Sequence, residues 1–161
     1  MPVTVRNIHE RIVDQPKSKI LELFSTLATS NDAIWPMEKW PAMQFKNGLV
    51  PGSVGGHGPI RYEVQQYDPS GMAQFKFLKP EGFEGIHRLK IIDTGHQQTQ
   101  LVHTIEMRTE GLGTLAWFLA IRSLHDALIE DAFDKVENHF TPNKKRTNWS
   151  VWVRVLRWVL R

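Results

Sequence analysis

Three side chains that could do acid–base chemistry fall within segments where apolar and polar residues alternate. They are Tyr62, His87 and His103, and each is followed two residues later by an aliphatic residue. Alternation of this kind places every second side chain on one face of a strand. A neutral imidazole there could orient a ligand oxygen or relay a proton, and a phenol could donate to a ligand carbonyl. These three are the candidate catalytic groups; the alternative is that they are core or cavity-edge residues with satisfied polar atoms.

A histidine and two tryptophans in irregular segments are further candidates. His57 lies in residues 55–59, Gly-Gly-His-Gly-Pro, which lack the lysine and following helix of a phosphate-binding loop. The segment predicts either a turn with positive φ angles or a mobile cavity mouth with His57 as its gate. Trp35 and Trp40 each precede a proline, which disfavours helical backbone. They could stack on a flat ligand at an entrance, or pack short helices against a sheet.

Polar residues within the long C-terminal helical stretch have a simpler interpretation. Arg122 and Asp126 are four residues apart, so we expect them to pair on the solvated face, with His125 beside them. No carboxylate alternates with the inward histidines, and we therefore expect no metal ion and no cofactor. The chain has no cysteine, which excludes thiolate chemistry and suits a cytoplasmic location.

The periodicity of the sequence predicts the elements that would position these residues. Residues 3–13 predict a strand, residues 16–28 an amphipathic helix, and residues 29–32 the start of a second short helix. Alternation then predicts an antiparallel meander over residues 42–46, 60–65, 73–77, 87–91 and 101–108. Helical spacing resumes after Gly113 and continues to Phe140, a helix of about 40 Å that could cross the whole sheet.

Four segments, taken in order, carry a family resemblance. They are residues 10–16 (Glu-Arg-Ile-Val-Asp-Gln-Pro), 55–62 (Gly-Gly-His-Gly-Pro-Ile-Arg-Tyr), 87–91 (His-Arg-Leu-Lys-Ile) and 99–106 (Thr-Gln-Leu-Val-His-Thr-Ile-Glu). Together with the terminal helix, their order resembles the START-like, or Bet v 1-like, superfamily (SRPBCC) and its polyketide cyclase/dehydrase-like members. The resemblance implies an α+β helix-grip fold, in which a curved antiparallel sheet surrounds a long C-terminal helix, with two short helices after the first strand. It assigns residues 1–142 to a ligand-binding domain.

A long helix laid into a bent sheet predicts an apolar cavity between the two, which is the usual form of a small-molecule site. The ligand-binding residues we expect come from the sheet, its loops and the helix: Trp35, Trp40, His57, Tyr62, Phe75, Phe77, His87, Leu89, His103 and Leu119. The alternative is that these side chains fill the space themselves. The expected ligand is a small hydrophobic molecule such as a lipid, a polyketide or an aromatic compound.

Three functions are compatible with such a site. We favour a carrier or sensor, because the inner face offers no carboxylate to set the tautomer of a histidine. The second hypothesis is a cyclase- or dehydratase-type enzyme that uses the three candidate catalytic groups. The third is an interaction module that acts through the C-terminal tail.

The tail, residues 143–161, differs from the rest of the chain in charge and pattern. The formal net charge of the chain is +3. The tail contains six basic residues and no acidic residue, so the body, residues 1–142, carries about −3. A nucleic-acid-binding body is therefore not expected. On a helix, residues 149–161 present a narrow arginine-containing wedge and are apolar elsewhere. This pattern predicts contact with a membrane surface or, alternatively, burial against the body or a second copy of the chain.

Overall fold

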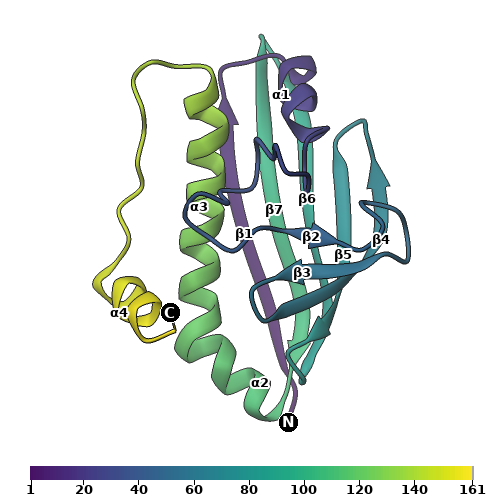
Figure 1. Cartoon of the computed structure of the whole chain (residues 1–161), viewed down its shortest axis with the longest axis vertical. Coiled ribbons are helices and arrows are strands. Elements are labelled where there is room, and N and C mark those ends of the chain that lie inside the picture. Colours follow the sequence, from purple (N-terminus) through teal and green to yellow (C-terminus); the bar gives the residue numbers. More distant parts are fainter. Residues whose placement is uncertain (161) are drawn as a thin grey trace.

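A seven-stranded antiparallel sheet is the frame of the structure, a computed structural model that describes residues 1–160 (Figure 1). The strands are β1 (Val3–Val13), β2 (Gln44–Phe45), β3 (Val54–His57), β4 (Ile60–Asp68), β5 (Met72–Lys79), β6 (Phe83–Gly95) and β7 (Gln98–Thr109). Their order across the sheet is β1-β7-β6-β5-β4-β3-β2, so the first and last strands in sequence are neighbours. Register shifts in β4 bend the sheet where β2 and β3 curl across its concave side (Figure 1).

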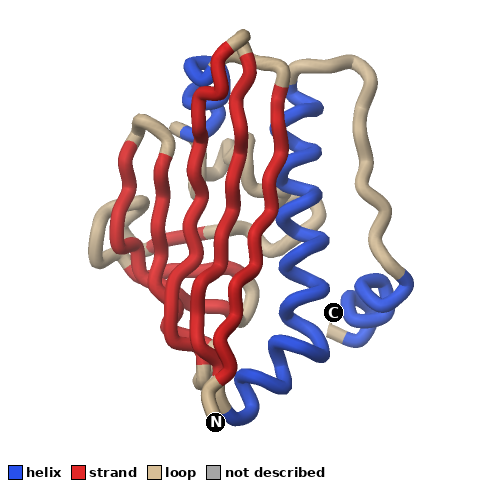
Figure 2. Tube along the Cα trace, turned by 180° about the vertical axis from the view of Figure 1, so that it is seen from behind, coloured by secondary structure: helices blue, strands red, loops and turns tan. Residues whose placement is uncertain are grey.

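One long helix lies across the concave side of this sheet, on the side of β1 (Figures 1 and 2). It consists of α2 (Gly111–Ala116), a π-helical turn η1 (Trp117–Ile121) and α3 (Arg122–His139). The two shorter helices are α1 (Lys17–Phe24), after β1, and α4 (Val151–Val159), in the tail. The expected α+β helix-grip architecture is confirmed, and β1 has the expected bounds.

The prediction of a second short helix after α1 is wrong, because residues 25–43 form a series of turns. The carboxylate of Asp32 organises them by accepting backbone N–H bonds from Ala28, Ile34 and Trp35, all at 2.7–2.8 Å. These N–H groups are satisfied locally by a side chain, which removes the need for a helix. The two prolines at 36 and 41 then prevent helical continuation.

The apolar interior is divided into two clusters. The main core joins α1, the turns, the sheet and most of α3, and it includes Ile20, Phe24, Tyr62, Phe75, Leu89, Leu101, Leu128, Phe133 and Val136. The second core lies toward the α2 end of the molecule and consists of Val5, Phe77, Phe83, Ile105, Met107 and Trp117. On β7, Leu101 belongs to the main core and Ile105 to the second, so His103 lies at the boundary between them.

The π-helical turn determines which side chains of the long helix face inward. Its i→i+5 bonding adds one residue to the helix, so the residues before it are rotated relative to the buried face of α3. Trp117 is thereby buried, whereas Phe118 and Leu119 are more than half exposed. The expectation that Leu119 lines the interior is therefore wrong.

By length and composition alone, the helix from Gly111 to His139 is apolar enough to cross a membrane, but only 22% of its most apolar stretch is buried in the body. The core helix of a soluble protein can have the same composition, so this is weak evidence for a spanning segment. It does show that much apolar surface of this helix has no cover within the described chain.

The tail returns along α3 and is fastened to it (Figures 1 and 2). The backbone N–H of Thr147 donates to Asp134 at 2.5 Å. The buried carboxylate of Asp131 accepts from Lys39 Nζ at 2.7 Å and from the indoles of Trp40 and Trp149, both at 2.8 Å. The helix that we expected within residues 149–161 is present as α4.

Candidate functional site: a row of histidines

Five imidazoles form a row between the sheet and the long helix, here called the histidine row: His9, His125, His103, His87 and His57. Neighbouring ring centroids are 5.8 Å apart for His9 and His125, 5.0 Å for His125 and His103, and 5.7 Å for His103 and His87. Tyr62 joins the last two members, with its ring 4.5 Å from His87 and its hydroxyl 2.9 Å from His57 Nδ1. The row therefore extends from the β1 edge to the turn between β3 and β4.

Strand register explains why residues so distant in sequence meet. His9 on β1 is directly opposite His103 on β7. His87 on β6 faces Ile105, two residues beyond His103, so the two histidines are diagonal neighbours on the same face. His125 approaches this face from α3. The row occupies the boundary between the two apolar cores.

Four ring nitrogens in the row are buried and have no hydrogen-bond partner within residues 1–160. They are His87 Nε2, His103 Nδ1 and both nitrogens of His125, although His125 Nδ1 lies 3.6 Å from Asp126 Oδ1, just beyond hydrogen-bond distance. Most buried polar atoms in native proteins are paired, and one that is not costs about 1–3 kcal/mol. The concentration of such atoms at one place makes it the strongest candidate binding site in the described chain.

Burial keeps the inner histidines neutral. Desolvation holds the pKa values of His87 and His103 well below the usual 6.5, and their imidazole neighbours reinforce the effect. Desolvation likewise lowers the pKa of His57 to about 3 and lowers that of His125. The phenol pKa of Tyr62 is raised by burial. These groups can exchange hydrogen bonds with a ligand oxygen, but they do not present a positive charge at neutral pH.

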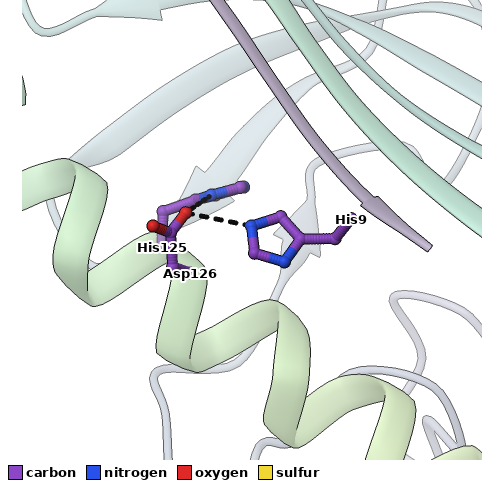
Figure 3. A group of neighbouring side chains, drawn as sticks. All are labelled: His9, His125 and Asp126. Atoms are coloured by element: carbon purple, nitrogen blue, oxygen red, sulfur yellow. Dashed lines mark hydrogen bonds and ion pairs between the residues drawn. The ribbon is translucent and has the colours of Figure 1, made fainter. Parts of the chain in front are cut away.

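The outer end of the row is acidic and charged (Figure 3). His9 donates from Nε2 to Asp126 and from Nδ1 to Glu130, both at 2.9 Å. Burial alone would lower the pKa of His9, but these carboxylates outweigh it and raise the pKa. Burial also opposes ionisation of Asp126, yet the imidazoles of His125 and His9 lower its pKa overall.

The same edge is held by a series of polar contacts between β1 and α3. Asn7 donates to Asp126 at 3.0 Å, and Arg11 donates to Glu130, Asp134 and Glu137. His9 therefore belongs both to this series and to the histidine row.

His9, His125 and Asp126 could also hold a metal ion, because one ligand atom of each lies within 4.8 Å of the others (Figure 3). Two imidazoles and a carboxylate suit a divalent transition metal. However, both nitrogens of His9 donate to carboxylates, and a metal ligand must give up such a proton. The geometry thus favours an ion-pair network, and the expected absence of a metal stays a prediction.

The structure brings most of the predicted ligand-binding residues together. Tyr62, Phe75, Phe77, Leu89, His87 and His103 are buried on the inner face of the sheet. Several of these rings touch, since Phe75 stacks on His87 with 4.8 Å between centroids. Two hollows lie elsewhere, one beside the tail and one beside Thr4 and Arg108 on the strands. Side chains thus fill the part of the interior around Phe75, where a cavity was expected.

The remaining candidates have different places. His57 ends β3, and its flanking Gly56 and Gly58 have φ angles of +150° and +49°, as the turn interpretation requires. Trp35 is buried and its ring lies 4.6 Å from His57, next to the row. Trp40 is buried away from it, against Trp149 of the tail.

Sequence reasoning missed the acidic end of the row. His9 was not a candidate, and Asp126 was assigned to a surface pair with Arg122, which does exist at 3.9 Å but is only one of its contacts. The expectation that His125 lies on the solvated face with this pair is wrong, because its ring nitrogens are buried beside the row and its Nδ1 lies 3.6 Å from Asp126 Oδ1. The available signal was a four-residue spacing of acids at 126, 130 and 134, matched by polar residues at 7, 9 and 11.

Comparison with solved structures identifies the class of fold. The chain has the Bet v 1-like helix-grip fold, as its sheet order and terminal helix indicate. Truncated norcoclaurine synthase from Thalictrum flavum superposes with a TM-score of 0.65 at 13% identity, covering 89% of this chain and 97% of that one. A protein of Nitrosospira multiformis gives a TM-score of 0.63 at 12% identity, over 88% of this chain and 100% of the other.

The Bacillus cereus protein XoxI gives a TM-score of 0.62 at 9% identity, over 88% of this chain and 99% of that one. No protein-family model matches the sequence, and no curated protein is detectably similar to it. At these identities the likeness establishes the fold alone.

Proposed function

We propose that the chain binds a small, largely apolar molecule carrying at least one hydrogen-bonding oxygen, with that oxygen at His103 and His125. The observation that carries the proposal is the group of unpartnered buried nitrogens in the histidine row. A ligand oxygen within hydrogen-bond distance of these nitrogens would satisfy atoms that otherwise weaken the fold. The surrounding apolar clusters would accept the rest of the molecule, a polyketide, lipid or aromatic compound.

The polar end of the ligand belongs at the α3 side of the row. Around Phe75 the rings are in contact, whereas Ile60, Ile121 and Leu124, near the boundary between the cores, are only partly buried. Norcoclaurine synthase, which shares the fold, was solved in complex with dopamine and hydroxybenzaldehyde. That precedent supports a small aromatic ligand as one member of the proposed class.

A catalytic function is the second candidate, and one observation favours it. Asp126 lies beside both His125 and His9, so a carboxylate is available to orient an imidazole that faces the interior. Such a pair could move a proton to or from a bound ligand. Carrier and enzyme would share the binding site and differ only in whether the ligand is recovered unchanged.

Native mass spectrometry of the purified protein, followed by extraction of any retained molecule, tests the proposal. His103→Phe and His125→Phe keep a ring of similar shape but remove the unpartnered nitrogens. We expect both variants to fold at least as stably as the parent and to lose the retained molecule. His96→Asn is the matched control, since His96 is exposed in the β6–β7 turn with a φ of +52° that asparagine tolerates.

Retention of the same molecule, in the same amount, by both phenylalanine variants would contradict the proposal. Incubating the extracted molecule with fresh protein then separates the two functions, because a carrier returns it unchanged and an enzyme converts it.

A further inference from the structure

The tail helix α4 presents its apolar side to solvent. At about 100° per residue, five side chains share a face of roughly 120°: Trp158, Val151, Val155, Val159 and Trp152. All five are exposed, and Trp158 is 76% exposed. The opposite side holds Val153, which is buried, and Arg157, which is partly buried. An amphipathic helix fastened to a protein normally hides its apolar side, so this orientation implies a partner outside the chain.

A second set of exposed apolar side chains adjoins α4. Leu112, Leu115, Phe118 and Leu119 on α2 and η1 are all more than half exposed. The indole Nε1 of Trp152 donates to the backbone oxygen of Leu119 at 2.9 Å, which joins the two helices (Figures 1 and 2). The outer face of α4 and these four residues are called the docking surface below.

Cationic side chains line a hollow next to this surface. The hollow has a volume of about 560 Å³ and is bounded by Lys39 and tail residues that include Arg146, Arg154 and Arg157. No aspartate or glutamate lines it within the described chain. The guanidinium of Arg157 is fixed above the rings of Trp40 and Trp149, at 4.3 and 4.7 Å from their centroids.

We propose that the docking surface lies on an anionic phospholipid bilayer and that the hollow receives a lipid phosphate group. Tryptophan and arginine are the residues that suit the headgroup boundary of a membrane. Basic residues near an anionic leaflet add attraction, and α4 carries Arg154 and Arg157 beside the hollow. Arginine also forms bidentate contacts with phosphate.

A second copy of the chain is a poorer occupant of this surface. A two-fold contact brings the same patch of each protomer together. Tail would then face tail, and Arg154 and Arg157 of each copy would gather around one apolar contact. The bilayer instead supplies the opposite charge together with an apolar layer.

Sedimentation of the full chain with lipid vesicles tests the proposal. Phosphatidylcholine vesicles with and without phosphatidylglycerol are compared at low and high salt. We expect binding to the anionic vesicles that weakens with salt. Trp158→Ser should weaken it about tenfold because an exposed aromatic ring no longer enters the interface. Arg154→Gln should weaken it about fivefold because one cation near the surface is lost.

Matched controls use exposed residues elsewhere. Val50→Ser and Lys90→Gln remove an exposed apolar side chain and an exposed cation from other parts of the body, and both should bind as the parent does. Leu112→Ser, at a residue 84% exposed, tests whether the long helix takes part. Point variants are preferable to truncation because the tail is bonded to the body.

Three results would count against the proposal. One is equal sedimentation of parent, Trp158→Ser and Arg154→Gln. Another is a dimer, seen by light scattering, that Trp158→Ser dissociates while the parent ignores anionic vesicles. The third is binding of inorganic phosphate without vesicle binding, since it would show a soluble anion site and no bilayer contact.

Discussion

The two halves of the long helix are both rich in apolar residues but use them in opposite ways. In α3, Leu128, Ile129 and Phe133 are buried in the main core. In α2 and η1, Leu115 and Phe118 are more than half exposed. The difference follows from what lies opposite each half. Acidic residues of α3 bond to β1 and hold it against the sheet, whereas the π turn rotates the preceding residues outward. Burial of an apolar helix thus depends on the polar contacts that fix its orientation as well as on its composition.

The largest difference in stability is expected when a phenylalanine is replaced by alanine in each of the two parts of the long helix. Phe133→Ala should lower the free energy of unfolding by about 3–5 kcal/mol, because the ring is 2% exposed and leaves a cavity. Phe118→Ala should change it by much less, roughly 0.5 kcal/mol, because the residue is already 51% exposed. Urea denaturation of both variants measures the difference. Equal losses would show that α2 and η1 are packed in solution.

A smaller effect is expected from the polar contacts that hold α3. Arg11→Leu should cost about 3 kcal/mol, since it removes the cation shared by three carboxylates and leaves Asp134, whose side chain is 4% exposed, with the N–H of Thr147 in place of an ion pair. Arg6→Leu on the same strand is the control; its side chain is 69% exposed and its pair with Glu106 should contribute under about 1 kcal/mol. The same denaturation curves report both, and matching losses would mean that the β1–α3 contacts do not hold the helix.

The smallest expected change in the free energy of unfolding, taken per titrating side chain, is its dependence on pH. His87 and His103 have lowered pKa values in the folded state, so they are neutral there but protonate below about 6.5 when unfolded. Their contribution to stability is therefore present above pH 6.5 and is lost as the pH falls, by about 1.4 kcal/mol per pH unit for each. The raised pKa of His9 acts in a different pH range: its contribution to stability is fully present below about pH 6.5 and is lost as the pH rises through the folded pKa, so it does not offset the loss below pH 6.5.

Unfolding free energies measured between about pH 7.5 and 5.5 check this sign. His103→Phe should flatten the acid limb by the equivalent of one proton. A parent protein that grows more stable as the pH falls below 6.5 would contradict the lowered pKa values of His87 and His103.

Local patterns predicted much of this molecule, and non-local contacts account for the rest. The bounds of β1 and the inward positions of Tyr62, His87 and His103 follow from alternation along single strands. The π turn at Trp117 has no signal in helical periodicity, so the outward direction of Leu119 was not predictable. The prediction of a second short helix failed because the side chain of Asp32 satisfies backbone N–H groups that a helix would otherwise pair. Helical periodicity carries no signal for such a contact.

The candidate site was predictable only from the sheet side. His9 and Asp126 are 117 residues apart, and only the pairing of β1 with β7 beneath α3 brings them into contact. The acids spaced by four residues were compatible with an exposed helix face, because charged stripes on helices are usually solvated. Polar residues at every second position of β1 (7, 9 and 11) match acidic residues at every fourth position of α3 (126, 130 and 134). A search for such matched patterns would have connected His9 with Asp126.

The buried carboxylate of Asp131 links three distant parts of the chain. It accepts hydrogen bonds from Lys39 and Trp40 in the turns and from Trp149 in the tail, and its own side chain is 0% exposed. Releasing the tail would remove one of two indole donors from the same oxygen and uncover the ring of Trp40. The turns, α3 and the tail should therefore unfold cooperatively in a single transition, although charge and composition divide the chain at residue 142.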